Sequence, residues 1–297
     1  MAAATTPLAQ DEAAFRPRNA SRISPLVRFC RQEPLAAALG LLTLVMTGMA
    51  VFAPLVTPHS PNEIVALPLL EPSASHPFGT DEFGRDLFTR VVFGARVSLA
   101  VGFLATGIGV ALAFVIGVTC AYAGGWLDYL VQRIVDAVQA VPAVVLLLGI
   151  VVALGPSLTS IVLALSVRSG IVSSRIIRSA TLGIRSLDYV TAAESIGATK
   201  ARIIARHLGP NVLPIALVMG SVSLSANVIA EASISFLGFG LRPPDPTWGR
   251  MLSDGRAYML SAPNLIYIPT AALAIVVLTA NLLGDAVRDR LDPRLRG

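Results

Sequence analysis

The feature that most constrains this chain is a set of long apolar runs without charged side chains. Between Arg96 and Asp128 there is no Asp, Glu, Lys or Arg, and another such run extends from Pro34 to Asn62. A helix needs about 20 apolar residues to cross a bilayer. Hydrophobic residues make up 54% of the 297 residues and charged residues only 14%. We therefore expect an all-α membrane protein and not one or two soluble domains.

The apolar runs and their breakers predict six transmembrane helices. The first run is longer than the signal-peptide core of about 7–15 residues, so we interpret it as an uncleaved span. The expected spans are a first from about Leu35 to Val56, a second that ends near Gly124-Gly125, a third from Asp128 to Gly155-Pro156 with a kink at Pro142, a fourth from Ser157 to Leu182, a fifth that begins near Pro214, and a sixth from Pro263 to Leu283. The membrane domain is then 34–287, with tails at 1–33 and 288–297.

Arginine distribution predicts the orientation. The chain has 23 basic residues and a net charge of +5, and nearly all of its basic residues are arginines near the ends of spans. That pattern is typical of membrane topology and not of nucleic-acid binding. Sixteen of the 23 basic residues fall in the two tails, in the segment 186–210 or at the adjoining ends of the third and fourth spans, against six on the other side, which places the tails and that segment in the cytoplasm. The polar segments 57–90 and 239–262 are then outside, and the second is expected to be a Pro-rich loop.

The segment Asp188–Asn211, which we call the elbow, is the longest polar interruption in the second half of the chain. It reads DYVTAAESIGATKARIIARHLGPN and contains five alanines, the central Gly197 and the chain's only lysine, Lys200. Small residues allow another surface to approach the backbone closely, and the glycine marks a bend. We interpret the elbow as a docking segment for a soluble partner. The alternative is an amphipathic helix on lipid headgroups, which five alanines would support poorly.

Several classes of chemistry find no support. Cys30 and Cys120 are too few for a disulfide framework, and three scattered histidines have no metal-ligand spacing. Lys200 follows Thr199, so the chain cannot supply a P-loop lysine. We predict no metal, no bound cofactor and no catalytic residue.

Two polar residues within the spans are candidates for a transport pathway. Arg168 falls near the middle of the fourth span, where it must face protein, water or a transported solute. Its alternative is a structural pair with an acidic residue of a neighbouring helix or subunit. Glu231 falls near the outer end of the fifth span. There it could contact the substrate, and the alternative is that it anchors a loop. A secondary transporter would need central acidic residues for ion coupling, which these spans lack.

Three segments carry a resemblance to a known family. Residues 76–103 read HPFGTDEFGRDLFTRVVFGARVSLAVGF, residues 231–255 read EASISFLGFGLRPPDPTWGRMLSDG, and the third is the elbow. The chain resembles the membrane permease subunits of dipeptide, oligopeptide and nickel ABC importers, and within them the second permease of the pair. In the elbow this chain has Thr191-Ala192-Ala193 where the family often has Glu-Ala-Ala, with Glu194 one position later.

The resemblance implies a function and its partners. The chain would be a permease subunit that imports peptides or similar solutes, or alternatively nickel or metal chelates, across the bacterial cytoplasmic (inner) membrane. Its partners would be a second homologous permease, two ATPase subunits that bind ATP and Mg, and an extracytoplasmic substrate-binding protein. Within the elbow, which resembles the family's cytoplasmic coupling loop, the candidate coupling residues are Tyr189, Thr191, Ala192, Ala193, Glu194, Gly197, Ala198, Lys200 and Arg202.

The motif before the second span has two interpretations. Its residues are Gly79, Thr80, Asp81, Gly84, Arg85, Asp86 and Arg96. By resemblance it forms an ordered extracytoplasmic structure near the mouth of the translocation path. The simpler interpretation is a turn that caps the helix beginning near Leu87, with Asp86 as the N-cap. The two interpretations are compatible.

Overall fold

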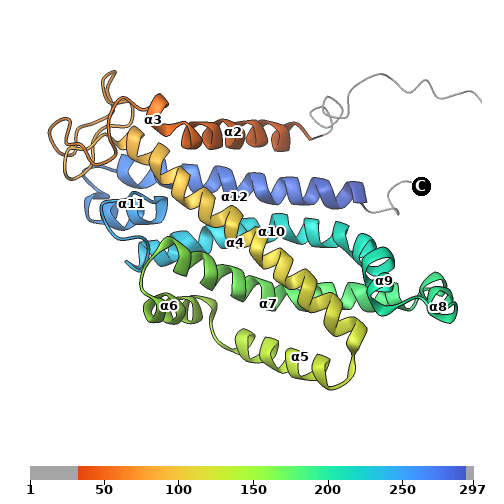
Figure 1. The fold of residues 1–297 in the computed structure, drawn as a ribbon. Helices are drawn as coiled ribbons and strands as arrows, with labels where there is room; N and C mark the ends of the chain where they lie inside the picture. Colours follow the sequence, from red (N-terminus) through yellow and green to blue (C-terminus); the bar gives the residue numbers. More distant parts are fainter. Residues whose placement is uncertain (1–32, 292–297) are drawn as a thin grey trace, which may run out of the picture.

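The computed structural model describes residues 33–291, which are helical apart from loops and contain no β-strand. Two isolated bridges, Ile64 to Arg85 and Thr80 to Asp86, occur in the segment before the second long helix. The helices, labelled as in Figure 1, are α2 (Pro34–Val51), α3 (Ala53–Val56), α4 (Leu87–Ala123), α5 (Gly125–Ala140), α6 (Ala143–Leu154), α7 (Leu158–Arg185), α8 (Asp188–Ser195), α9 (Lys200–Ile203), the π-helical turn η1 (Ile204–Leu208), α10 (Gly209–Phe236), α11 (Trp248–Gly255), the 3₁₀ turn η2 (Arg256–Tyr258) and α12 (Asn264–Leu291).

The long helices form the expected membrane bundle. Within residues 33–291, five helices are long and apolar enough to cross a membrane: α2, α4, α7, the continuous helix Lys200–Phe236, and the segment Asn264–Ala286 of α12. The bent pair α5–α6 makes six if it counts as one span. Figure 1 shows the long helices side by side, and α10 contacts α4, α7 and α12. We call the end that carries α8 and α9 the elbow end, and the end that carries α3 and α11 the loop end.

Small residues let α4 and α7 pack closely. A Cβ atom added at Gly117 would lie 2.7 Å from the Ile177 Cβ, and one at Gly170 would lie 2.8 Å from the Leu112 Cβ. In a bilayer the hydrophobic effect does not drive helices together, because lipid tails are as apolar as the side chains. Glycines instead allow two helices to approach closely and make van der Waals contacts. Two further glycines of α4, Gly107 and Gly109, differ in this respect. Gly109 does pack, against Ser169, whereas a Cβ at Gly107 would meet nothing within 4 Å.

The third predicted span is broken and not merely kinked. α5 and α6 meet at 98° around Val141 and Pro142. Pro142 has no N–H to donate, and its ring forces Val141 into an extended conformation, with φ −88° and ψ 130°. The amphipathic α5 also begins at Gly125, before Asp128. Within α5, Arg133 pairs with Asp136, with 3.3 Å between Nη1 and Oδ2.

The fifth span begins earlier than predicted. The helix continues from Lys200 through η1 to Phe236, so Pro214 lies inside α10 and does not open it. The π-helical turn, in which the Gly209 N–H donates to the Ile204 carbonyl, adjusts the backbone just before Pro210. The Asn211 side chain then donates to the His207 carbonyl at 2.6 Å. The helix therefore continues through Pro210 and Pro214, the second of which the sequence suggested as its start.

The segment 239–262 is not only a loop, as the sequence had suggested. It contains α11, whose N-cap Thr247 accepts a hydrogen bond from the Arg250 N–H. The Trp248 side chain is fully buried, and its Nε1 donates to the Val91 carbonyl at 3.1 Å. Burial of this one aromatic side chain holds α11 against α4. The prolines of the segment suggested a loop, and this tertiary contact could not be predicted from them.

The remaining boundaries agree closely with the sequence. The first span is α2 with the short α3, and α4 ends at Ala123, before Gly124 with φ +62°. The fourth span is α7 with Ser157 as its N-cap, and the last helix extends past the predicted Leu283 to Leu291. The predicted tail 1–33 lies outside the described residues except for Glu33, as do residues 292–297 of the other tail.

Candidate functional site

The elbow consists of two short helices that turn about Gly197. α8 ends there because Gly197 adopts φ +82°, and the Ala198 N–H donates back to the Ala193 carbonyl at 3.1 Å. This pattern is a helix C-cap that favours glycine. The Thr199 side chain then caps α9 by accepting from the Arg202 N–H. Figure 1 shows α8 and α9 extending beyond the bundle at one end.

The inner face of the elbow is fixed to the bundle by a small apolar cluster. Val190, Ile203 and Leu208 are at most 1% exposed, and Tyr122 of α4 and Ile184 of α7 pack against them. Burial of each such side chain contributes about 1.5–3 kcal/mol. The elbow is therefore held to α4 and α7 by apolar contact, and to α10 by chain continuity.

An arginine reinforces the elbow end. The Arg185 Nη1 donates to the Ala121 and Tyr122 carbonyls at 3.0 and 3.1 Å, and its guanidinium lies 5.0 Å from the Tyr122 ring centroid. These carbonyls belong to the last turn of α4, where a helix has no internal donors and carries partial negative charge. The C-terminal ends of α4 and α7 are thereby joined beneath the elbow.

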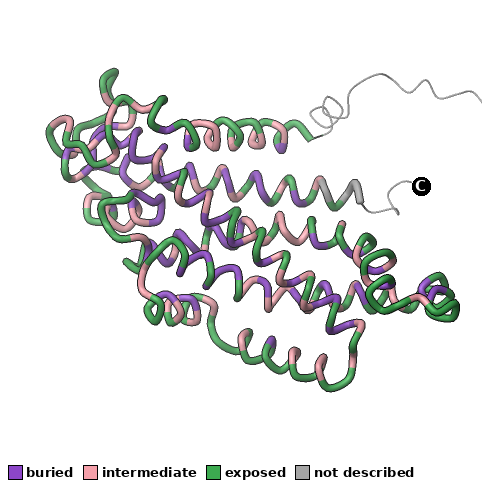
Figure 2. The backbone as a smooth tube through the Cα atoms, in the orientation of Figure 1, coloured by how far each residue is buried: buried purple, intermediate pink, exposed green. Residues whose placement is uncertain are grey.

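The outer face of the elbow is exposed, and one of its large hydrophobic side chains is exposed far more than the others. Ile196 is 86% exposed, directly before Gly197. Figure 2 shows the elbow end as largely exposed. The predicted coupling residues divide between the two faces: Ala193 is buried and Ala198 is half-buried, whereas the exposed ones are Tyr189, Thr191, Ala192, Glu194, Gly197, Lys200 and Arg202. The sequence analysis missed Ile196, although its position beside the bend glycine was the available signal.

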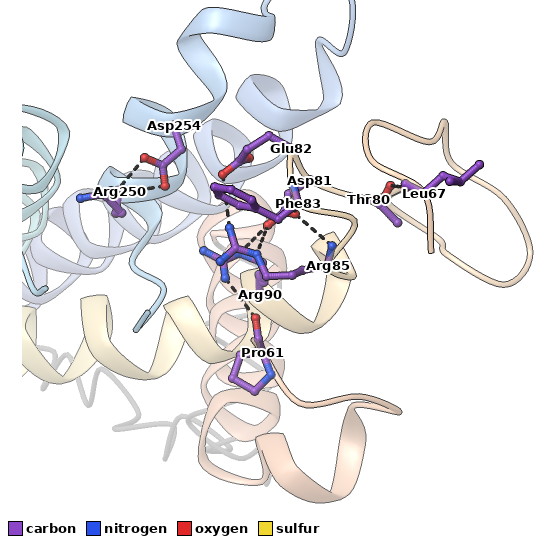
Figure 3. Close-up of polar contacts among 10 residues, drawn as sticks. All are labelled: Pro61, Leu67, Thr80, Asp81, Glu82, Phe83, Arg85, Arg90, Arg250 and Asp254. Atoms are coloured by element: carbon purple, nitrogen blue, oxygen red, sulfur yellow. Dashed lines mark hydrogen bonds and ion pairs between the residues drawn. The ribbon is translucent and has the colours of Figure 1, made fainter. Parts of the chain in front are cut away.

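At the loop end, one buried carboxylate organises the predicted motif (Figure 3). Asp81 is 3% exposed, and its Oδ1 accepts from the Phe83 and Arg85 N–H groups at 2.9 and 3.0 Å. Its Oδ2 accepts from the Arg85 Nε at 2.6 Å and lies 3.2 Å from the Arg90 Nε. Arg90 also donates to the Pro61 carbonyl at 3.0 Å. Asp81 thus joins the loop 57–86 to the first turn of α4.

The other motif residues have structural positions as well. Asp86 is confirmed as the N-cap of α4, because its Oδ2 accepts from the Thr89 N–H at 2.8 Å. Its Oδ1 lies 3.1 Å from the His76 Nδ1. Thr80 donates to the Leu67 carbonyl at 2.7 Å. These contacts place the motif within the folded loop end.

Two glycines of the motif are required by sterics. Gly79 and Gly84 adopt φ +82° and +79°. A Cβ added to them would lie 2.3 Å from the Leu70 carbonyl oxygen and 2.1 Å from that of Ala66. Arg96, by contrast, is exposed on α4, away from this network.

Glu82 lies beside the same network, and its carboxyl pKa is shifted from the usual value. Burial raises the pKa of the Glu82 carboxyl, and the nearby Asp81 and Asp254 carboxylates raise it further, against the lowering effects of a backbone hydrogen bond and of Arg85. A cleft of about 350 Å³ opens beside Arg85 and Arg90 of the same network. Its charged lining comes from Arg85, Arg90, Arg250, Asp245 and Asp254. The cleft therefore presents both signs of charge at the loop end.

The two pathway candidates lie in different surroundings. Glu231 is 1% exposed, and its carboxylate accepts from the Ser98 and Ser235 hydroxyls at 3.0 and 2.7 Å. The Trp248 N–H in turn approaches the Ser98 Oγ at 3.4 Å, so Glu231 lies under the start of α11. Arg168 is half-buried on α7 and lines a cavity between α7 and α10. The structure does not bring these two residues into one site.

Comparison with known proteins identifies the family. A family model described as "binding-protein-dependent transport system inner membrane component" matches residues 85–297. The dipeptide transport system permease protein DppC of Alkalihalophilus pseudofirmus is 39% identical over 249 residues, which cover 84% of this chain and 82% of the relative. The glutathione transport system permease protein GsiD of Pectobacterium atrosepticum is 35% identical over 271 residues, which cover 91% and 90%.

A solved structure shares the fold. A chain of the methionine ABC transporter MetNI, in an inward-facing conformation, aligns with a TM-score of 0.57 and 23% identity, over 69% of this chain and 98% of that one. The all-helical bundle and the family match together show that the chain belongs to the binding-protein-dependent transport system inner membrane components, which are the permease subunits of ABC importers.

Proposed function

We propose that the chain is one of two homologous permeases in an ATP-driven importer of peptides or peptide-like solutes. Support comes from its relatives, one named for dipeptide and one for glutathione transport. In this proposal two ATPase subunits bind ATP and Mg at the elbow end, which faces the cytoplasm together with both termini. An extracytoplasmic binding protein delivers the solute at the loop end, and the complex resides in the bacterial cytoplasmic membrane.

The exposed face of the elbow is the observation that carries the proposal. Ile196, 86% exposed, stands beside a rigid glycine cap, while the opposite face of the elbow is packed against the bundle. A large apolar side chain on a firmly supported projection is the type of anchor that fills a pocket on a partner protein. Its firm support would carry a movement of the partner into α4, α7 and α10.

The loop end supports a second docking site. The cleft of about 350 Å³ has three arginines and two aspartates in its lining, and it lies on a rigid scaffold built by Asp81. Mixed charges in a surface cleft favour specific orientation of a polar partner more than tight burial. We assign this cleft to the delivery side of the importer.

The proposal is tested with Ile196→Asp in the importer co-expressed with its ATPase subunits. Loss of a central apolar anchor costs at least about 2 kcal/mol, so the affinity of the ATPase for the permease should fall about thirtyfold. The matched control is Leu260→Asp, because Leu260 is 95% exposed but lies at the loop end. Affinity is measured by titration of labelled ATPase onto the permease in detergent, and uptake in proteoliposomes.

The outcomes separate the competing functions. Equal ATPase affinity for Ile196→Asp and Leu260→Asp would refute the elbow as the docking face. Peptide uptake that continues without ATP and follows a proton or sodium gradient would instead indicate a secondary transporter. ATP-dependent uptake of nickel or metal chelates in place of peptides would keep the machinery and change the cargo.

A further inference from the structure

An arginine in the membrane-spanning part of α7 has a nitrogen without a hydrogen-bond partner among residues 33–291. Arg168 is roughly 16 Å of helix rise from the N-cap Ser157 and roughly 25 Å from Arg185 at the other end of the helix. Its Nε is buried and makes no hydrogen bond to any residue that the structure describes. A cation at this depth requires a counter-charge or polar neighbours.

The carboxylates that the described helices bring near α7 are committed elsewhere. Asp128 and Asp136 of α5 pair with other arginines of α7, toward the elbow end. Glu231 of α10 accepts hydrogen bonds from two serines at the loop end. Within residues 33–291, Arg168 therefore has a positive charge that no ion pair balances.

A cavity with five polar side chains in its lining lies beside this arginine. It has a volume of about 180 Å³, and its polar lining is Arg168, Ser169 and Ser173 of α7 with Ser223 and Asn227 of α10. The Asn227 Nδ2 donates to Thr106 of α4 at 3.0 Å, which fixes the position of the amide. Since a water molecule occupies about 30 Å³, the space accommodates a carboxylate with a small attached group.

The chemistry of the lining selects for an anion. A guanidinium presents several N–H donors in a plane and pairs with both oxygens of a carboxylate, while the hydroxyls of Ser173 and Ser223 can donate to the remaining lone pairs. The Ser169 hydroxyl already donates to the Ser166 carbonyl. In the part of the chain that the structure describes, no acidic side chain lines the cavity. A cation or a wholly apolar group would leave the arginine unpaired, so neither fits this lining.

We infer that the cavity between α7 and α10 binds the carboxylate of the transported solute, with Arg168 as its counter-charge. The inference rests on the proposed function, since a peptide with a free C-terminus supplies such a carboxylate. An acidic side chain of the second permease is the competing partner. The cavity favours the solute, because a contact between subunits needs neither the space nor the hydroxyl groups that both helices of this chain provide.

The test measures the charge preference of the cavity in the assembled importer. Cys30 and Cys120 are replaced by Ser, and Ser223→Cys places a thiol in the cavity wall. The labelling rates of an anionic reagent, sulfonatoethyl methanethiosulfonate, and a cationic one, aminoethyl methanethiosulfonate, are compared. We expect the anionic reagent to react faster, and Arg168→Gln to lower the anion-to-cation rate ratio about tenfold because a unit charge has been removed.

Two variants control for structure. Arg175→Gln removes an arginine from the same helix outside the cavity and should leave the ratio unchanged. Arg168→Lys keeps the charge and should keep the anion preference, which distinguishes a charge effect from misfolding. Alanyl-alanine should slow labelling of the cysteine during turnover, whereas its C-terminal amide, which lacks the carboxylate, should not.

Three results would overturn the inference: a ratio that Arg168→Gln does not change, absence of labelling by either reagent in every nucleotide state, or loss of the second permease from the purified complex of Arg168→Gln. The third result would assign Arg168 to the subunit interface. Failure of the proposed function is separate, because it would appear as a wild-type importer without ATP-dependent peptide uptake even where the anion preference is present.

Discussion

Asp81→Asn should destabilise the loop end far more than loss of a surface charge would. Asparagine can keep one oxygen as the acceptor for the Phe83 and Arg85 N–H groups. Its amide nitrogen then faces the Arg85 and Arg90 guanidinium groups, where a carboxylate oxygen had accepted. Arg90 is only 4% exposed, so its charge stays buried after its partner is removed.

The magnitude follows from that burial. Breaking a buried ion pair by removing one partner costs about 3–5 kcal/mol, because the remaining charge is uncompensated. For a chain of this size, that corresponds to a fall of roughly 10 °C in the melting temperature. The control Asp245→Asn changes an exposed acid at the same end and should alter the free energy of unfolding by no more than about 0.5 kcal/mol.

The assay is thermal unfolding of the purified protein in detergent, extended to the double variant Asp81→Asn/Arg90→Met. Removing both charges eliminates the uncompensated cation, so the double variant should melt at a higher temperature than Asp81→Asn alone. The reasoning is refuted if the two substitutions lower the melting temperature additively, or if Asp81→Asn and Asp245→Asn melt at the same temperature. The buried ion pair would then not be what stabilises the loop end.

Two further predictions concern the same end of the molecule. Gly84→Ala should lower the free energy of unfolding by more than about 3 kcal/mol, since the new Cβ would lie 2.1 Å from the Ala66 carbonyl oxygen at a φ of +79°. The control Gly183→Ala, in open space on α7, should be neutral or stabilising. The yield of folded protein in detergent compares the two variants. Because burial raises the pKa of Glu82 above its unfolded value, its contribution to stability is present below the unfolded pKa and is lost as pH rises through the folded pKa. Glu82→Gln should therefore melt at a higher temperature than wild type at neutral pH and lose that advantage toward about pH 4, and an equal difference at every pH would contradict this explanation.

The spans could be predicted because the bilayer restricts them so strongly. Runs without charge, such as the one between Arg96 and Asp128, have few alternatives to a membrane helix. What failed was the effect of particular prolines. Pro142 breaks a helix, whereas Pro214 lies inside α10. The residue type is the same in both places, so a pattern of residue types could not distinguish them.

The sites were predictable in composition and less so in arrangement. The motif with Asp81 and Asp86 was found, and the capping role of Asp86 is confirmed by its hydrogen bond to Thr89. Arg90 was missed as a partner of Asp81, since their pairing depends on how the loop folds onto α4. In the elbow, residue size alone could not indicate that Ala193 is buried whereas Ile196 is exposed.

The unbroken helix Lys200–Phe236 gives the molecule a stiff rod. Its 37 residues correspond to roughly 55 Å of rise, enough to join the two surfaces of a membrane without an intervening joint. A displacement of the Lys200 end of this helix is therefore transmitted to its Phe236 end, where Glu231 and α11 lie. The wider π-helical turn at Ile204–Leu208 is where such a helix would bend first.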